Sequence, residues 1–230
     1  MEQQPKQAQR IQTSFINAAE RKALVWLAER QPRWVTSDML TLVGVVGAFL
    51  TGLGFYLTNH NINWLWLSTA GLIVNWYGDS LDGTLARVRN HQRPIYGYYL
   101  DHTVDCINEA FMFIGAGLSP LVNLNLTLAA FILYLFLTIN VSINAHLKSE
   151  FRLTYAKLGP TEFRLLIVIA NTVLIASPSL AAATYSILGF SLTLLDIIAV
   201  IVIALLAGIY LVTFISDARH YARIDPPHKN

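Results

Sequence analysis

Long apolar segments alternate with short polar segments along most of the chain. Six of them have the apolar character of membrane-spanning helices, and all but the fifth have the length of about 20 residues that crosses the hydrocarbon core of a bilayer. They lie at about residues 35–58, 64–87, 97–118, 124–146, 161–176 and 188–215. The pattern therefore predicts an all-α integral membrane protein with six transmembrane helices.

The segment before the first span has a different pattern. In residues 11–33, apolar side chains recur at helical spacing among charged ones, which is typical of an amphipathic juxtamembrane helix on the bilayer surface. Pro32 is expected to end this helix, and a helix packed on a soluble partner is the alternative. We therefore divide the chain into a polar N-terminal tail (residues 1–10), the amphipathic helix (11–33), a six-helix transmembrane domain (34–215) and a C-terminal tail (216–230).

Composition agrees with a membrane location and narrows the classes of partner. Hydrophobic residues make up 54% of the 230 residues and charged residues 13%, whereas a soluble domain carries about 25% charged residues. The net charge is +2 and there is no basic tract, so we expect the lipid bilayer and no nucleic acid as a partner. The single cysteine, Cys106, excludes an intramolecular disulfide.

The distribution of cations predicts the orientation. With six spans, all 16 Lys and Arg residues fall in or beside the N-terminal arm, the second-to-third loop, the fourth-to-fifth loop and the C-terminal tail. These segments share one side of the membrane, and the turns on the other side contain no Lys or Arg. By the positive-inside rule, both termini are cytoplasmic.

Four aspartates lie at the cytoplasmic ends of the second and third predicted spans. Asp79 and Asp82 are one helical turn apart, as are Asp101 and Asp105. If the two helices face each other, the four carboxylates meet, and hard oxygen ligands of this kind suit Mg²⁺, Mn²⁺ or Ca²⁺ rather than zinc. A cation is required there, because burying unpaired carboxylates costs several kcal/mol.

The spacing of these acids resembles the signature of the CDP-alcohol phosphotransferase (CDP-alcohol phosphatidyltransferase) family of membrane enzymes of phospholipid synthesis. That signature reads D-x2-D-G-x2-A-R, then eight or nine residues, then G-x3-D-x3-D. Its fixed positions are occupied by Asp79, Asp82, Gly83, Ala86, Arg87, Gly97, Asp101 and Asp105. Helix caps or structural ion pairs would explain single acids, but capping does not require this spacing.

The resemblance implies the chemistry of the site. Two divalent cations, Mg²⁺ or Mn²⁺, would be held by Asp79, Asp82, Asp101 and Asp105. Asp105 would also be the catalytic base, and a CDP-alcohol donor, CDP-diacylglycerol in our interpretation, would transfer its phosphatidyl group to a small polar alcohol and release CMP. The residues that would bind the donor nucleotide and phosphate are Gly83, Ala86, Arg87 and Gly97. For Arg87 the alternative is pairing with an acid, and for Gly97 it is helix packing.

The acceptor is less determined by the sequence. Four cations could line a pocket for a phosphorylated acceptor, or could only satisfy the positive-inside rule: Lys148, Arg152, Lys157 and Arg164. His102 follows Asp101 and resembles the Asp-His pair of the choline and ethanolamine phosphotransferases. This leaves transfer of phosphocholine or phosphoethanolamine to diacylglycerol as the alternative reaction. No role is predicted for Glu109 or Asp196.

Two functions from other classes compete with this reading. Intramembrane acids also mark ion paths, but in a divalent metal transporter they would extend through the bilayer, whereas here all except Asp196 cluster at one edge. A non-catalytic scaffold would be expected to lack signature acids, and none is missing. We therefore expect an enzyme in a bacterial inner membrane, with its site on the cytoplasmic side. The sequence leaves open whether it forms a homodimer, as many members of the resembled family do.

Overall fold

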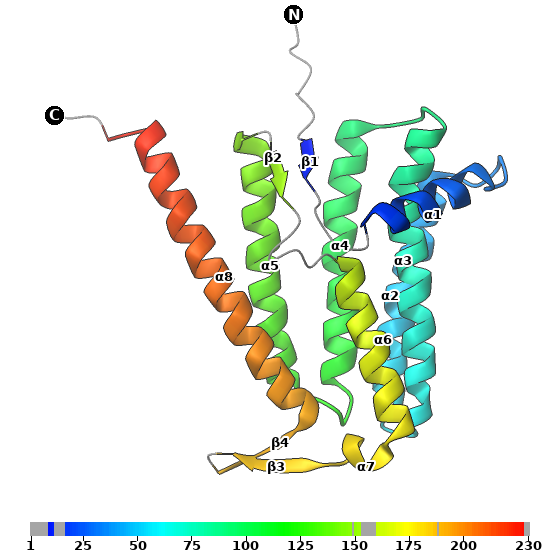
Figure 1. The fold of residues 1–230 in the computed structure, drawn as a ribbon, viewed down its shortest axis with the longest axis vertical. Coiled ribbons are helices and arrows are strands. Elements are labelled where there is room, and N and C mark those ends of the chain that lie inside the picture. The colour runs from blue at the N-terminus through cyan, green and yellow to red at the C-terminus, as the bar shows by residue number, and fades with distance from the viewer. Residues whose placement is uncertain (1–8, 12–16, 149, 153–159, 188, 228–230) are drawn as a thin grey trace, which may run out of the picture.

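The computed structural model describes residues 9–11, 17–148, 150–152, 160–187 and 189–227, which form a mainly helical bundle (Figure 1). The long helices are α2 (Ser37–Leu57), α3 (Leu65–Val88), α4 (Pro94–Gly117), α5 (Leu124–Lys148), α6 (Pro160–Ala176) and α8 (Leu194–Ile224). The short helices are α1 (Asn17–Glu29), the 3-10 turn η1 (Ile62–Trp64) and α7 (Pro178–Ala181). Strand β1 (Gln9–Ile11) pairs in parallel with β2 (Glu150–Arg152), and β3 (Thr184–Ile187) pairs antiparallel with β4 (Phe190–Thr193).

Helix composition confirms an all-α integral membrane protein. Within the described ranges, three helices are long and apolar enough to cross a membrane: α2, residues Leu124–Ala145 of α5, and α8. Helices α3 and α4 are more polar because they carry the signature acids. Figure 1 shows α1 and the C-terminal end of α8 at one end of the bundle and the β3–β4 hairpin at the other.

Helices α2 and α3 form the tightest pair in the bundle. A Cβ atom built on Gly78 of α3 would lie 2.3 Å from the Gly44 nitrogen and 2.4 Å from the Leu40 carbonyl oxygen of α2. The same closeness holds at Gly47, where a Cβ would lie 2.2 Å from the Asn75 nitrogen. The obstructing atoms are backbone, so only glycine allows this approach.

This packing predicts the effect of adding one methyl group. Gly78→Ala is expected to destabilise the protein by about 1–3 kcal/mol, because the two helix backbones must separate to admit the methyl group. Gly208→Ala on α8 is the matched control, since a Cβ there meets no atom within 4 Å. Thermal unfolding in detergent measures the difference, and equal melting temperatures for the two variants would contradict the close packing.

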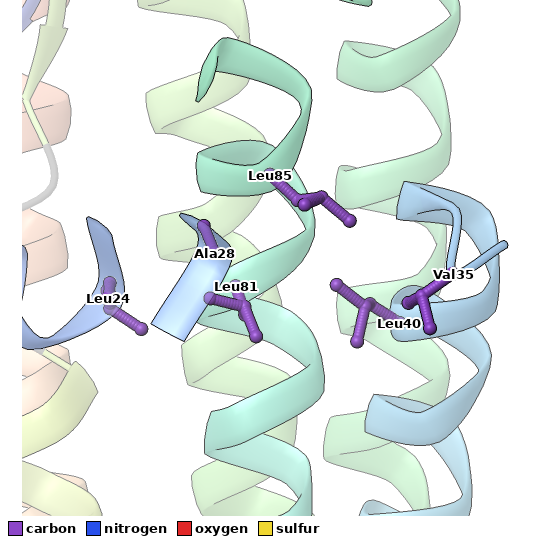
Figure 2. Packing of buried hydrophobic residues seen from close by; sticks show 6 residues of the cluster. All are labelled: Leu24, Ala28, Val35, Leu40, Leu81 and Leu85. Atoms are coloured by element: carbon purple, nitrogen blue, oxygen red, sulfur yellow. The ribbon is translucent and has the colours of Figure 1, made fainter. Parts of the chain in front are cut away.

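Helix α1 packs on the bundle through one side. Leu24 and Ala28 of α1 contact a cluster with Leu81 and Leu85 of α3, completed by Val35 and Leu40 at the start of α2 (Figure 2). The predicted segment 11–33 is thus helical over Asn17–Glu29, while Ile11 lies in β1 and residues 12–16 are outside the described ranges. Trp26 is on the uncovered side, 52% exposed.

The end of the chain differs from the sequence prediction in two ways. The last span was expected from about residue 188, but residues Phe190–Thr193 form strand β4 and α8 begins at Leu194. Thr193 and Asp196 make a capping box that fixes this start: the Thr193 hydroxyl accepts from the Asp196 N–H, and the Asp196 carboxylate accepts from the Thr193 N–H. Helix α8 then continues past residue 215 to Ile224, into the segment assigned to the C-terminal tail.

The capping box also explains Asp196, for which the sequence predicted no role. Its second carboxylate oxygen accepts a hydrogen bond of 2.6 Å from the Asn123 N–H, next to the start of α5. The Asp196 side chain is buried, at 5% exposure. Both of its carboxylate oxygens accept from backbone N–H groups, those of Asn123 and Thr193. Asp196 is therefore a structural residue that joins the start of α8 to the start of α5.

Candidate active site

Three of the four signature aspartates meet between α3 and α4. Asp79 comes from α3, and Asp101 and Asp105 lie one turn apart on α4. One carboxylate oxygen from each lies within 4.8 Å of the other two. Asp101 is exposed whereas Asp79 and Asp105 are partly buried, so this acidic cluster opens to the outside at one edge.

Asp82, the fourth signature acid, is held separately by α2. Its Oδ2 accepts a hydrogen bond of 2.6 Å from the Thr41 hydroxyl, and its Oδ1 accepts one of 2.5 Å from the Gly83 N–H. The Ser37 hydroxyl donates to the Asp82 carbonyl oxygen at 3.0 Å. The N-terminal turns of α2 therefore orient Asp82, a contribution that the signature alone does not include.

Arg164 is the cation that lies against the cluster. Its guanidinium donates to Asp79 Oδ2 at 2.6 Å, and both side chains are about one-fifth exposed, at 19% and 24%. Sequence analysis assigned Arg164 to the acceptor, whereas the structure brings it directly to a predicted metal ligand. Of the other three predicted acceptor cations, Lys157 lies outside the described ranges, and only the backbone is described for Lys148 and Arg152.

Space is open beside the two glycines that were predicted to bind the donor. A Cβ on Gly97 would meet nothing within 4 Å, and one on Gly83 would meet only the Arg87 guanidinium, at 3.5 Å. Helix packing thus does not explain Gly97, which was the alternative considered from the sequence. Arg87 donates to the Thr84 hydroxyl at 3.0 Å, and Ala86 lies beside it on the last turn of α3.

An ion pair joins the starts of α2 and α4 at the mouth of the site. Arg93, just before α4, donates to Asp38 in the first turn of α2 and lies 4.1 Å above the Tyr96 ring. The hydrogen bond with Asp38 raises the pKa of the Arg93 guanidinium above its ordinary value. It brings the N-terminal turn of α4, and with it Gly97, towards the helix that orients Asp82.

Two further side chains of α4, Glu109 and His102, lie close in sequence to the signature aspartates. Glu109 is one turn beyond Asp105 and is hydrogen-bonded to Tyr134 of α5, a partner that no sequence motif predicted. Its Oε2 is buried and has no hydrogen-bond partner among the residues that the structure describes. His102 stacks on Tyr98 with ring centroids 4.1 Å apart, and its Nδ1 contacts the Tyr98 carbonyl oxygen at 3.0 Å.

Comparison with known families agrees with the signature. A sequence model described as CDP-alcohol phosphatidyltransferase matches residues 34–202, most of the chain. The chain belongs to the CDP-alcohol phosphatidyltransferase family. The matched region contains all eight signature positions, Arg164 and most of the long helices, so the family assignment covers the bundle as well as the motif.

By their names, the relatives fall into cholinephosphotransferases on one side and archaetidylinositol or phosphatidylinositol phosphate synthases on the other. Cholinephosphotransferase 1 of Gallus gallus is 29% identical over 126 residues, covering 49% of this chain and 37% of the relative. The archaetidylinositol phosphate synthase of Pyrococcus horikoshii is 33% identical over 95 residues, covering 40% and 46%. The phosphatidylinositol phosphate synthase of Cutibacterium acnes is 34% identical over 84 residues, covering 36% and 38%.

Each of these matches spans less than half of the relative's length. This family and these relatives are CDP-alcohol phosphotransferases, which transfer substituted phosphate groups. The comparisons therefore establish the family, while the donor and the acceptor used by this CDP-alcohol phosphatidyltransferase homologue must be argued from its own residues.

Proposed function

We propose that this protein transfers a phosphatidyl group from CDP-diacylglycerol to the hydroxyl group of a polar alcohol or phosphorylated polyol and releases CMP. The observation that carries the proposal is the cluster of Asp79, Asp101 and Asp105 within 4.8 Å, in a chain that has every position of the family signature. We also propose that the chain crosses the membrane six times, with both termini and the site on the cytoplasmic side. This arrangement is supported by the cation distribution along the sequence.

The donor set fits divalent cations. Only carboxylate oxygens converge in the cluster, which suits Mg²⁺ or Mn²⁺. We propose that Asp79, Asp82, Asp101 and Asp105 hold two such ions, which neutralise charge on the pyrophosphate and on the departing CMP. Asp79 would contact an ion through Oδ1, since its Oδ2 accepts the hydrogen bond of 2.6 Å from Arg164.

The protein's own residues supply the remaining steps. Asp105 accepts the proton of the attacking hydroxyl group as that oxygen bonds to the phosphatidyl phosphorus and the bond to CMP breaks. Gly83 and Gly97 leave room for the nucleotide and phosphate groups of the donor to approach α3 and α4. Ala86 and Arg87 would bind the same groups of the donor. The Arg164 guanidinium, which has further N–H groups besides the one bonded to Asp79, would bind the phosphate of a phosphorylated acceptor together with Lys148, Arg152 and Lys157.

A second candidate reaction is transfer of phosphocholine or phosphoethanolamine from a CDP-linked headgroup to diacylglycerol. It is favoured by His102 directly after Asp101 and by the similarity to cholinephosphotransferase 1. Both reactions use the same acidic cluster and release CMP, so they differ only in which substrate carries the lipid.

The test is CMP release by purified protein in detergent with Mg²⁺ or Mn²⁺. CDP-diacylglycerol is supplied with inositol phosphate, glycerol phosphate, serine or inositol in turn, and Asp101→Asn protein is the control. Acceptor-dependent CMP in this panel supports the proposal and names the acceptor. Release only from CDP-choline or CDP-ethanolamine with diacylglycerol would replace it by the second reaction, and silence in both panels would favour a transporter or scaffold.

A further inference from the structure

Helix α1 carries a carboxylate on the side that faces the bundle. Glu20, Leu24 and Ala28 follow one another at intervals of four residues, so they share one face of α1. Leu24 and Ala28 are buried against α3, at 8% and 2% exposure. A carboxylate on this face must be matched by hydrogen-bond donors, because an unpaired one would be costly to desolvate.

The donors come from two different helices. Glu20 Oε1 accepts a hydrogen bond of 2.7 Å from the Trp76 indole N–H of α3 and one of 2.6 Å from the Thr161 hydroxyl of α6. A single oxygen atom thus joins α1, α3 and α6. Thr161 lies in the first turn of α6, where the helix dipole also favours a negative charge.

Both donors are close in sequence to the acidic cluster. Trp76 precedes Asp79 on α3 by three residues, and Thr161 precedes Arg164 on α6 by three residues. The two bridges, Glu20 to Thr161 and Arg164 to Asp79, therefore tie the first two turns of α6 to the rest of the bundle. The position of the Arg164 guanidinium depends on where these turns lie.

We propose that Glu20 is a positioning residue that couples helix α1 to the active site by fixing the start of α6, and thereby Arg164, against Asp79. Helix α1 is held by its own apolar contacts with α3, so it provides a fixed reference for Glu20. Neither the signature nor the matched region, which begins at residue 34, includes this helix. The coupling is a feature of this chain's own contacts.

Substitutions at Glu20 test the hydrogen bonds that its Oε1 accepts from Trp76 and Thr161. Glu20→Gln keeps an Oε1 acceptor for both donors, so it is expected to behave like the wild type. Glu20→Ala removes the acceptor and leaves both donors unmatched. Glu29→Ala is the matched control, because Glu29 is an exposed carboxylate on the same helix.

Hydrogen exchange of the purified full-length protein tests the coupling without requiring activity. Glu20→Ala is expected to raise the exchange rate of the peptide that covers residues 161–168, while the exchange rate of α2 stays unchanged. Glu20→Gln and Glu29→Ala are expected to leave the exchange of residues 161–168 as in the wild type. Unchanged exchange at residues 161–168 in Glu20→Ala would overturn the proposal. General acceleration in every helix would also overturn it, since it would indicate a purely structural role.

A double-mutant cycle tests whether Glu20 acts through Arg164, and this arm rests on the transfer reaction proposed above. Glu20→Ala is expected to lower kcat/KM about tenfold or more, as misplacement of a substrate-contacting group does. The double variant Glu20→Ala, Arg164→Gln should be no slower than Arg164→Gln alone. Losses that multiply would overturn the coupling, whereas an inactive wild type would overturn the proposed reaction and leave the exchange result to decide on Glu20.

Discussion

Asp101→Asn is expected to abolish acceptor-dependent CMP release, with a loss of at least about a hundredfold, as when one electrostatic contact to a transition state is removed. The residue is exposed at the open edge of the cluster, so the substitution should leave the fold intact. It replaces a charged oxygen ligand by a neutral amide at the point where Asp79 and Asp105 converge. Asp82→Asn should cause a similar loss, because all four carboxylates are proposed to hold the ions jointly.

Two measurements check this result. CMP release gives the rate, and Mn²⁺ titration of the detergent-purified protein gives the affinity for the ion, which should fall together with the rate. Asp225→Asn is the control, since Asp225 is an exposed acid at the end of α8. Near-normal transfer in either Asp82→Asn or Asp101→Asn would exclude the proposed site.

Asp105→Asn is expected to bind the donor but not to turn it over. The amide has almost the same shape as the carboxyl group, yet it cannot accept the proton of the attacking hydroxyl group. Removing a general base costs about 10²–10⁴-fold in rate. Donor affinity should stay within the wild-type range if Asp105 acts as the base rather than mainly as a ligand of the ions.

This result is checked by titrating the variant with CDP-diacylglycerol in the presence of Mn²⁺ and by measuring a single turnover of CMP release. Asp101→Asn is the comparison, since it is expected to lose both ion binding and turnover. If Asp105→Asn loses donor affinity in proportion to its rate, Asp105 acts mainly as a metal ligand and the base must be sought elsewhere. Glu109 would then be the next residue to test, since it lies one turn along the same helix and its Oε2 has no hydrogen-bond partner in the described part of the chain.

The four signature aspartates show how much of a site's geometry follows from residue spacing along a helix. Asp79 and Asp82 were expected to face a common centre with the acids of α4, and Asp79 does lie within 4.8 Å of Asp101 and Asp105. Residues three apart on a helix point about 60° away from each other, so two side chains one turn apart can meet different neighbours. Asp82 has an additional partner that spacing along α3 does not predict, since its Oδ2 accepts from the Thr41 hydroxyl of α2.

The same limit applies to the helix ends. Apolar periodicity indicated the helices, but it extended the last span back to residue 188, where β4 precedes α8. The sequence carries the Thr193 and Asp196 capping pair that sets the boundary, and a closer reading of capping chemistry would have found it. The hydrogen bond from Asn123, by contrast, joins residues 73 positions apart and has no local signal.

The sequence by itself determined the membrane class, most of the helices and the eight signature positions, because hydropathy and spacing along one helix are local properties of the chain. Only the tertiary structure decided that Arg164 lies against Asp79 and that Glu20 joins Trp76 to Thr161. These pairs link α1, α3 and α6, and the face that one helix turns towards another follows from packing. The packing of α2 on α3 is one example, since glycines of both helices let the two backbones come into contact.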